Sequence, residues 1–326
     1  MASQEGIRPL SSMNHIHDLT EVKLPTSDVT IGSFDGVHLG HQRLVCELVE
    51  TAHQEGRPAV VLTFFPHPSV VLRGRKPSFY INSPEEKAEI LASLGVDYVI
   101  TQRFDLELSR VTAADFLDRL QSSLGLRGLW VGEDFALGHN REGNRAYLEQ
   151  HAAGRDFKLH VVPPVKVQGE IVSSTRVREA LRSGAVAQVE AYLGRPFLLP
   201  GKVIRGAGRG HELGFPTANL SIWDERAYPR AGVYVCLAEL EGEQHPAVTN
   251  IGHRPTFEDD GGPPIIESHL IDFDGALYGM QIRLEFLQRL RDERRFPNRQ
   301  ALMDQISQDI QRAREIIAER REEDHA

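Results

Sequence analysis

Cysteine is scarce in this chain of 326 residues, which contains only Cys46 and Cys236. Two thiols cannot build a disulfide framework or a zinc site of four thiolates, so we expect both to be small core residues. Long hydrophobic runs are also missing. Residues 1–12 contain no apolar signal segment, and no apolar run approaches the roughly 20 residues that span a membrane. These absences predict no membrane partner and a location in the reducing cytoplasm.

An excess of positive charge is the third absence. The chain carries 37 Lys and Arg against 46 Asp and Glu, a net charge of −9, and neither half is basic. Proteins that hold nucleic acid without sequence preference need a basic surface. We therefore expect small-molecule substrates and no nucleic acid, and the sequence is compatible with a homo-oligomer. The length favours two domains.

Near-continuous apolar segments alternate with helical patterns in the first 190 residues. This alternation is typical of a parallel sheet covered on both faces, which binds ligands beyond the carboxyl ends of its strands. Residues 1 to about 15 are polar and are expected to be loose. The expected strands are Val29–Phe34, Ala59–Phe64, Val96–Thr101, Leu129–Gly132 and Leu159–Val162. The expected helices are residues 41–54, 84–94, 113–124, 145–153 and 175–183.

The pattern changes after a short helix, Ala185–Leu193, and a linker at residues 194–196. Alternating apolar and polar residues with turns between them then indicate an antiparallel barrel or sandwich. An amphipathic helix from Pro297 onward ends the chain. The expected strands here are Gly201–Arg205, Gly232–Leu240, His245–Asn250, Ile265–Phe273 and Met280–Phe286. We place the two domains at residues 15–190 and 195–326.

The segment TIGSFDGVHLGHQ, residues 30–42, lies at a strand-to-helix turn. Free backbone N–H groups and the helix dipole attract anions there, and Gly32, Gly36 and Gly40 let a ligand approach the main chain. His38 and His41 can then donate to phosphate oxygens and stabilise charge when pyrophosphate leaves a nucleotide. The alternative is a turn with two exposed histidines; the combined pattern favours the phosphate site.

Three further segments of the first domain carry polar groups near expected strand or helix ends. His67, in TFFPHP, can point into the same crevice as His38, or can be an ordinary imidazole in a rigid turn. Asp134, in VGEDFALGHNREGN, can accept from a ribose or adenine donor, or can cap a turn. In VSSTRVREAL, Ser174 is a natural N-cap, and Arg178 one turn later can hold phosphate oxygens.

The second domain contains a glycine-rich loop and the segment PTAN, residues 216–219. Thr217 and Asn219 are two apart on an extended segment, so they share a face and offer the hard oxygen ligands that Mg²⁺ prefers. The alternative is a glycine-rich hairpin with a turn. In the strand IIESHL, Glu267 is either an ordinary solvated residue or, if it reaches Thr217 and Asn219, the acceptor of a proton from an attacking alcohol.

Taken together, these segments resemble the prokaryotic bifunctional riboflavin kinase/FMN adenylyltransferases (FAD synthetases). The first-domain matches are GSFDGVHLGHQ, TFFPHP, VGEDFALGHNREGN and VSSTRVREAL. The second-domain matches are GKVIRGAGRG-HELGFPTANL, TNIGHRPTF, IIESHLIDFDGALYGMQIRLEF and LRDERRF. The resemblance implies an α/β nucleotidyltransferase of the His-x-Gly-His type, with a Rossmann-like parallel sheet. A C-terminal antiparallel β-barrel riboflavin kinase domain with a long C-terminal helix would follow it.

The implied activities are ATP-dependent phosphorylation of riboflavin to FMN, and adenylyl transfer from ATP to FMN to give FAD and pyrophosphate. ATP and Mg²⁺ are the implied cofactors. The implied catalytic residues are His38, His41, Arg178 and Glu267. In the adenylyltransferase, ATP would contact Gly32, Phe34, Asp35, His38, His41, Asp134, Ser174, Thr175 and Arg178, and the flavin or adenylate pocket would contain Phe64, Pro66, His67 and Pro68.

In the kinase, the resemblance implies magnesium at Thr217 and Asn219 and flavin beside Glu267 and Arg291. Its ATP would contact Lys202, Gly206, Gly208, Arg209, Gly210, Gly214, Thr217 and Asn219. Two positions depart from the pattern: Asp134, where some relatives have Asn, and His211, where many have Arg or Lys.

Two alternatives remain beside the bifunctional enzyme. One keeps a single activity, with the other domain reduced to flavin binding or regulation. The other is a transferase that uses the His-x-Gly-His turn on a different phosphorylated or carboxylated acceptor, and would bind no flavin. The PTAN and IIES segments disfavour that second alternative.

Overall fold

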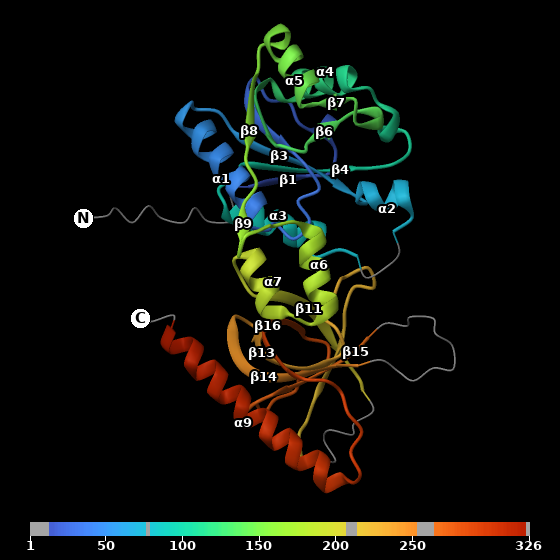
Figure 1. Cartoon of the computed structure of the whole chain (residues 1–326), viewed down its shortest axis with the longest axis vertical. Helices are drawn as coiled ribbons and strands as arrows, with labels where there is room; N and C mark the ends of the chain where they lie inside the picture. Colours follow the sequence, from blue (N-terminus) through green and yellow to red (C-terminus); the bar gives the residue numbers. More distant parts are fainter. Residues whose placement is uncertain (1–12, 76–78, 207–213, 253–263, 324–326) are drawn as a thin grey trace, which may run out of the picture. The chain divides into compact units, whose positions relative to one another are not determined.

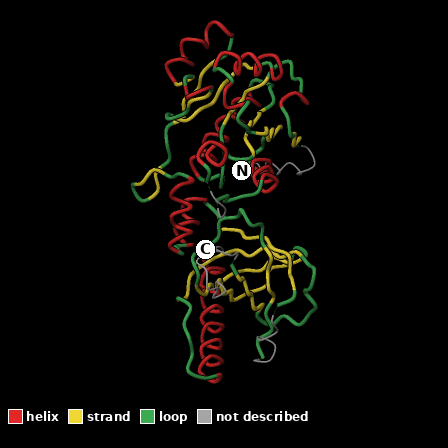
Figure 2. The backbone as a smooth tube through the Cα atoms, turned by 90° about the vertical axis from the view of Figure 1, so that its right-hand side faces the viewer, coloured by secondary structure: helices red, strands yellow, loops and turns green. Residues whose placement is uncertain are grey.

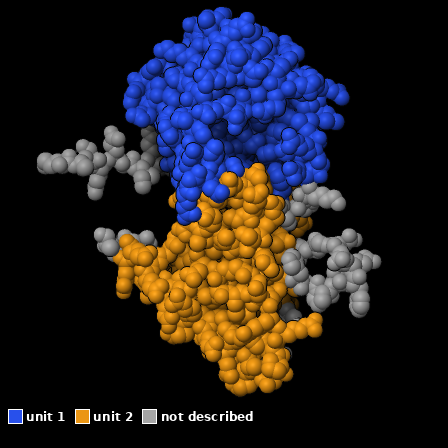
Figure 3. Space-filling model, viewed as in Figure 1, with its two compact units in different colours: residues 1–174 blue, residues 175–326 orange. Residues whose placement is uncertain are grey.

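The computed structural model describes residues 13–75, 79–206, 214–252 and 264–323. The chain divides into two compact units, residues 1–174 and residues 175–326 (Figure 3). Each unit has its own sheet and its own hydrophobic core.

A six-stranded parallel sheet forms the centre of the first unit (Figure 1). Its strand order is β1-β4-β3-β2-β5-β8, and every neighbouring pair is parallel. The predicted parallel sheet is therefore confirmed. Its strands are β1 (Asn14–Ile16), β2 (Ser27–Ile31), β3 (Ala59–Phe65), β4 (Tyr98–Arg103), β5 (Leu126–Gly132) and β8 (Lys158–Val162).

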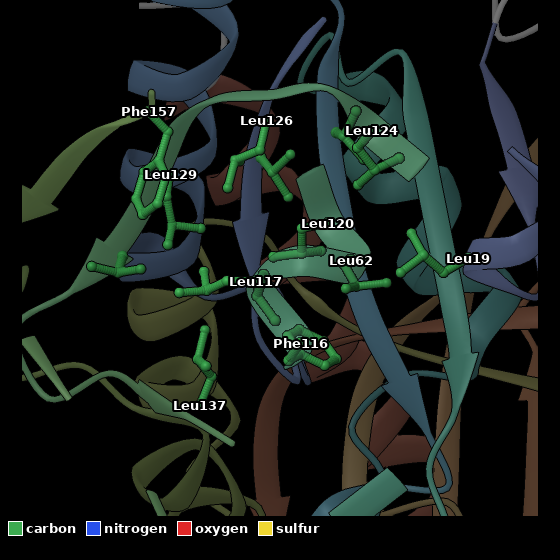
Figure 4. Packing of buried hydrophobic residues seen from close by; sticks show 14 of the residues in the cluster. Leu19, Leu62, Phe116, Leu117, Leu120, Leu124, Leu126, Leu129, Leu137 and Phe157 are labelled. Carbon is green, nitrogen blue, oxygen red and sulfur yellow. The ribbon is translucent and has the colours of Figure 1, made fainter. Parts of the chain in front are cut away.

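Helices cover both faces of this sheet, because alternate residues of each strand point to opposite sides. Val60 and Leu62 belong to the cluster that includes α4 and α5, whereas Ala59 and Val61 belong to the cluster that includes α1 and α3. Figure 4 shows Leu62 in the first of these clusters. Burying one such large apolar side chain contributes roughly 1.5–3 kcal/mol. The helices are α1 (Leu39–Gln54), α3 (Pro84–Ser93), α4 (Ala113–Leu124) and α5 (Arg145–Ala152).

Several short elements of the first unit are absent from the sequence prediction. Strand β1 lies within the segment expected to be loose, so that expectation is wrong for residues 14 and 15. Other short elements are α2 (Pro68–Arg73) and two strand pairs, β6 (Ala136–Leu137) with β7 (Gly143–Asn144) and β9 (Lys166–Val167) with β10 (Glu170–Ile171). The described residues also form 3₁₀ helices at Leu19–Glu21, Leu108–Arg110, His139–Arg141 and Ala153–Arg155.

The second unit contains a closed antiparallel barrel of order β11-β12-β15-β14-β13-β16, which confirms the barrel (Figure 2). Alternate residues such as Tyr234, Cys236 and Ala238 are fully buried. The strands are β11 (Phe197–Ile204), β12 (Ala218–Ser221), β13 (Gly232–Leu240), β14 (Glu243–Gly252), β15 (Ile265–Leu270) and β16 (Gln281–Arg291).

The long helix α9 (Arg299–Glu323) covers one side of the barrel. Ala313, Ile316 and Ile317 of this helix pack against Val233 and Val235 of β13, in a second-unit core cluster. The predicted C-terminal amphipathic helix is thus present. Two shorter helices precede the barrel: α6 (Ser174–Ser183), which begins at the last residue of the first unit, and α7 (Val186–Leu193).

The two cysteines differ in burial. Cys236 is buried inside the barrel, and burial raises the pKa of its thiol to about 12. Cys46 is exposed on α1, so the expectation that both are core residues is wrong for this one. The buried side of α1 carries Leu44, Leu48 and Ala52, and Cys46 points away from that stripe because two positions turn a helix by about 200°.

Candidate active sites

The strand order of the first sheet creates a switch point beside β2. The chain passes from β2 through β3 to β4 on one side and then crosses to β5 on the other side. Loops that leave neighbouring strands in opposite directions open a crevice at the carboxyl ends of those strands, where ligands of such sheets bind. The turn with His38 and His41 follows β2, and the loop with Asp134 follows β5. The topology therefore brings these two predicted segments to the same place.

The turn between β2 and α1 has an unusual backbone. Phe34, Gly36 and Val37 have φ angles of 46°, 85° and 40°. Glycine adopts such angles freely, but the two other residues are strained by roughly 1–2 kcal/mol each. Phe34 is 2% exposed and Val37 is fully buried, so core packing of their side chains holds the strained turn in place.

The two histidines stack on each other at the start of α1. Their ring centroids are 3.6 Å apart with 19° between the planes. His38 is the N-cap, and its Nδ1 accepts a weak hydrogen bond from the His41 N–H at 3.4 Å. A Cβ at position 40 would lie 3.2 Å from the His38 ring, so Gly40 gives this ring its room. His38 is only 7% exposed, which contradicts a turn with two exposed histidines.

His41 has a buried ring nitrogen that is available to a ligand. Its Nδ1 has no hydrogen-bond partner among the described residues. The pKa of His41 is well below its usual value, first because of burial and then because His38 and Lys87 repel added positive charge. A neutral imidazole of this kind can hydrogen bond to an anion, and the charge of that anion would raise its pKa. The pair is therefore suited to phosphate oxygens.

Asp35 fastens this turn to two other segments. Its buried Oδ1 accepts from the backbone N–H groups of Ile81 and Asn82 at 3.0 and 3.4 Å. Its carbonyl accepts from the Ser174 hydroxyl at 2.8 Å. This hydrogen bond links two of the predicted motifs. Ser174 is the first residue of α6 rather than the residue before it, so the prediction that Ser174 is the N-cap is wrong by one position. Thr175 and Arg178 follow on α6, in residues counted with the second unit.

The loop after β3 is held by its own histidine. His67 caps α2, because its Nδ1 accepts from the Ser69 N–H at 3.0 Å. Its backbone N–H donates to the Tyr80 hydroxyl at 2.9 Å, and its ring lies edge-on to Phe79. Phe64, Pro66 and Pro68 are all partly exposed. This geometry gives His67 a structural role, and a role in a flavin or adenylate pocket stays a prediction.

Asp134 lies in an exposed loop after β5. Its carbonyl accepts from the Arg141 guanidinium at 2.7 Å. Asn140 and Arg141 both have positive φ angles, and a Cβ at position 138 would lie 2.5 Å from the backbone nitrogen of Ala113. The loop therefore has a defined shape, and the Asp134 carboxylate is solvent-accessible at the switch point.

The second unit places a row of polar residues across three neighbouring strands. Asn219 of β12 is the register partner of Glu267 of β15, and Glu267 is the register partner of Asn250 of β14. Facing residues on neighbouring strands have Cβ atoms about 4.5–5.5 Å apart. All three are partly buried, while Ile266 and Ser268 on either side of Glu267 are fully buried. The row thus lies on the outer face of the barrel, as the alternation in IIESHL predicts.

The PTAN segment is tied to the same row. Thr217 and Asn219 are partly exposed whereas Ala218 between them is buried, so the prediction that the two share a face is confirmed. The His269 ring donates from Nδ1 to the Pro216 carbonyl at 2.8 Å, which fixes the segment against β15. A Cβ at Gly206 would overlap the amide of Asn219, so this glycine lets the segment after β11 approach the row.

Comparison with known proteins gives two matches in the same order as the two units. The family model of FAD synthetase matches residues 21–176, and that of riboflavin kinase matches residues 193–317. The bifunctional riboflavin kinase/FMN adenylyltransferase of Pseudomonas fluorescens is 37% identical over 290 residues, which cover 89% of this chain and 92% of that protein. The enzyme of the same name from Bacillus subtilis is 34% identical, over 92% of this chain and 96% of that protein.

This chain belongs to the family of bifunctional riboflavin kinase/FMN adenylyltransferases. A solved structure described as a macrolide-efflux protein from Streptococcus pneumoniae also matches, with a TM-score of 0.85 and 29% identity over 93% of this chain and 99% of that one. Among the helices of the described residues, none has the length and apolarity needed to cross a membrane.

The structure describes only some of the other residues that the family resemblance places at the ATP site of the kinase. Lys202 is exposed on β11, and Gly214 has a φ of 82° just before PTAN. Gly208, Arg209, Gly210 and the departure at His211 lie outside the described residues.

Arg291, expected beside the flavin of the kinase domain, forms a bidentate salt bridge. Its guanidinium donates to both carboxylate oxygens of Asp309, with Nη2 2.8 Å from Oδ2. Asp309 is buried on α9, so this pair joins β16 to that helix. The contact of Arg291 with flavin stays a prediction.

Lys87 of α3 is a polar residue of the first site that the sequence reasoning missed. It is 5% exposed, and its Nζ donates to the Ser33 carbonyl at 2.9 Å and to the Thr63 hydroxyl at 3.0 Å. The signal was present in the helix pattern, because Lys87 and Leu91 are four positions apart and therefore lie on the same, buried face.

Proposed function

We propose that this chain converts riboflavin to FMN and then FMN to FAD, with one polar cluster in each unit responsible for one step. The chain is a riboflavin kinase and an FMN adenylyltransferase (FAD synthetase). The observation that carries this conclusion is the pair of family matches, one over the parallel-sheet unit and one over the barrel unit.

In the adenylyltransferase, an oxygen of the FMN phosphate attacks the α-phosphorus of ATP, and the bond from that phosphorus to the pyrophosphate oxygen breaks. The side chains of His38 and His41 hydrogen bond to the phosphate oxygens on which charge develops. The unpartnered Nδ1 of His41 supports this role. Ser174, Thr175 and Arg178 on the other helix would hold the remaining phosphates, and Gly32, Phe34, Asp35 and Asp134 would complete the ATP site.

The flavin or adenylate is proposed to lie against Phe64, Pro66, His67 and Pro68. In the kinase, the primary hydroxyl of riboflavin attacks the γ-phosphorus of ATP, ADP leaves, and Glu267 accepts the hydroxyl proton. The register of Glu267 beside Asn219 supports this role. Arg291 would lie at the flavin edge, and Lys202, Gly206, Gly208, Arg209, Gly210 and Gly214 would contact the nucleotide.

The donor set on PTAN fits magnesium. Thr217 offers a hydroxyl oxygen and Asn219 an amide oxygen on one face, and Mg²⁺ takes a few such hard ligands together with phosphate oxygens and water. A bound Mg²⁺ would neutralise phosphate charge. Within the described residues, no cluster of three or more His, Cys, Asp or Glu side chains offers a separate metal site.

The proposed domain limits are residues 15–190 and 195–326, the proposed location is the cytoplasm, and the proposed partners are small molecules.

Incubation of the purified chain with riboflavin, ATP and Mg²⁺, followed by chromatography over time, tests the proposal. FMN should appear first and FAD later. Formation of neither product would refute it, and FMN without FAD would leave only the kinase.

A further inference from the structure

Lys87 is a buried cation whose ammonium donates to two neutral oxygen atoms. Moving an ammonium group out of water costs several kcal/mol, so such a group persists only where the fold holds it firmly. The two acceptors are the Ser33 carbonyl and the Thr63 hydroxyl, and the Thr63 hydroxyl itself donates to the same Ser33 carbonyl at 3.1 Å. Three groups from three different segments therefore form one closed hydrogen-bonded triangle.

The triangle lies under both loops of the adenylyltransferase site. Ser33 belongs to the strained turn that leads from β2 to His38. Thr63 is fully buried near the end of β3, just before the loop that carries His67. Lys87 thus ties the start of one loop to the start of the other.

The same helix start secures the turn from a second direction. Asp35 accepts from the N–H groups of Ile81 and Asn82, directly before Ser83, which caps α3. Ser83 and Glu86 form a capping box that fixes the beginning of this helix. Lys87 is therefore presented from a rigid first turn.

The charge of Lys87 also reaches the site. Burial is the main cause of the lowered pKa of His41 on α1 and of His15 on β1, and the charge of Lys87 lowers both values further. The carboxylates that act on Lys87 are Asp35 and Glu85, which raise its pKa, but burial outweighs them and lowers that pKa to about 8. The ammonium is therefore charged at neutral pH and loses its proton over a range that experiments can reach.

We propose that Lys87 is a positioning residue for adenylyl transfer, whose ammonium holds the Ser33 carbonyl and the Thr63 hydroxyl so that the His38/His41 turn and the loop at residues 64–68 keep their reactive arrangement. This inference rests on the proposed role of the His38/His41 turn. Groups held before the substrate arrives do not have to reorganise during the reaction, and small misplacements near a reacting centre lower rates by up to about 100-fold.

Lys87→Met removes the charge and keeps the length of the stem. In the full chain we expect FAD formation from added FMN to fall about 100-fold, with riboflavin phosphorylation within about twofold of wild type because the triangle lies wholly in the first unit. The exposed Lys158 on β8 provides the matched control, and Lys158→Met should leave both rates unchanged. A wild-type rate of FAD formation in Lys87→Met would overturn the inference.

The pH dependence of FAD formation shows whether Lys87 acts through its charged ammonium or only through the packing of its side chain. In wild type, FAD formation should decline as pH rises through about 8, because the ammonium loses its proton. Lys87→Arg keeps the charge, so its decline should move to higher pH even where its overall rate is lower. An identical decline in wild type and Lys87→Arg would contradict the proposal.

Thr63→Val is a second variant that tests the same proposal if circular dichroism shows that Lys87→Met does not fold. It removes one acceptor with little change in shape and leaves Lys87 in place. We expect about a tenfold slower FAD formation and a decline that starts at lower pH, because the ammonium has lost a hydrogen bond. Folded Thr63→Val with the wild-type rate and profile would overturn the inference. Failure of wild type to form FAD would instead refute the proposed function.

Discussion

In the first unit Asp35, His38 and Lys87 of the candidate site are buried near the ends of parallel strands, whereas in the second unit Asn219 and Glu267 lie partly exposed on the outer face of a barrel. Asp35 accepts from the backbone N–H of Ile81 before α3, and Lys87 of α3 donates to the Ser33 carbonyl in the same turn as Asp35. The pKa of His41 is lowered first by burial and then by the charges of His38 and Lys87. Asn219 and Glu267 are instead placed by the register of β12 and β15. The comparison teaches that the two candidate sites are held in different ways, one by a buried hydrogen-bonded network and the other by the register of sheet strands.

The largest expected effect falls on the barrel. Glu267→Gln keeps the shape of the side chain but removes the proton acceptor, so riboflavin phosphorylation should slow by about 1,000-fold, within the range of general-base catalysis. Conversion of added FMN to FAD should not change. The control is Gln281→Ala, because Gln281 offers no such base and is exposed on β16, a barrel strand that does not pair with β15. Near-normal FMN formation in Glu267→Gln would remove this residue from the reaction.

Arg291 tests whether a residue near the barrel site has a structural role. Arg291→Ala leaves the carboxylate of Asp309 buried and unpaired, so the second unit should lose about 3 kcal/mol of stability, measured by denaturant unfolding. The double variant Arg291→Met/Asp309→Leu should recover that stability. If FMN formation recovers with it, Arg291 acts only through Asp309. Recovered stability without recovered activity would instead place Arg291 at the flavin.

A smaller effect is expected from crowding the sheet surface. A methyl group at position 206 would overlap the Asn219 amide, so Gly206→Ala should slow FMN formation about tenfold by displacing that side chain. Gly154→Ala is the control, because a Cβ there meets nothing within 4 Å. If Gly206→Ala phosphorylated riboflavin at the wild-type rate, the position of the Asn219 side chain beside Gly206 would not matter for the reaction.

The smallest effect concerns stability in the buried network. The pKa of Lys87 is lowered from 10.5 to about 8 in the folded chain, so between these values the unfolded chain binds more protons, and this group makes folding more favourable as pH rises. The contribution is about 1 kcal/mol between pH 7 and 9. The unfolding free energy of wild type minus that of Lys87→Met should therefore increase over this range. A constant difference would mean that Lys87 does not titrate there.

Much of the fold follows from patterns that local physics makes reliable. Alternation in segments such as IIESHL predicts which residues face the barrel interior, and the long apolar strands predict the parallel sheet. Short elements escaped prediction because three or four residues carry too little periodicity: β1 and β12 form through pairing with β4 and with β11 and β15. The small helix α2 also depends on a cap from His67 that composition does not reveal.

The sequence predicts the side chains of the candidate sites that have recognisable chemistry. It does not predict the contacts that hold those side chains in place. The stacking of His38 on His41 depends on the space beside Gly40, and the link from Ser174 to Asp35 joins residues 139 positions apart. Long-range contacts of this kind are set by tertiary packing, which no local pattern encodes. Lys87 was overlooked because a lysine is usually solvated.

The central claim is that each unit carries out one step on the same vitamin. The most direct measurement follows FMN and FAD by chromatography after riboflavin, ATP and Mg²⁺ are added to wild type, His38→Ala and Thr217→Ala. The account predicts that wild type forms FMN and then FAD, that His38→Ala accumulates FMN, and that Thr217→Ala forms no FMN yet converts added FMN to FAD. Equal loss of both activities in either variant would contradict it.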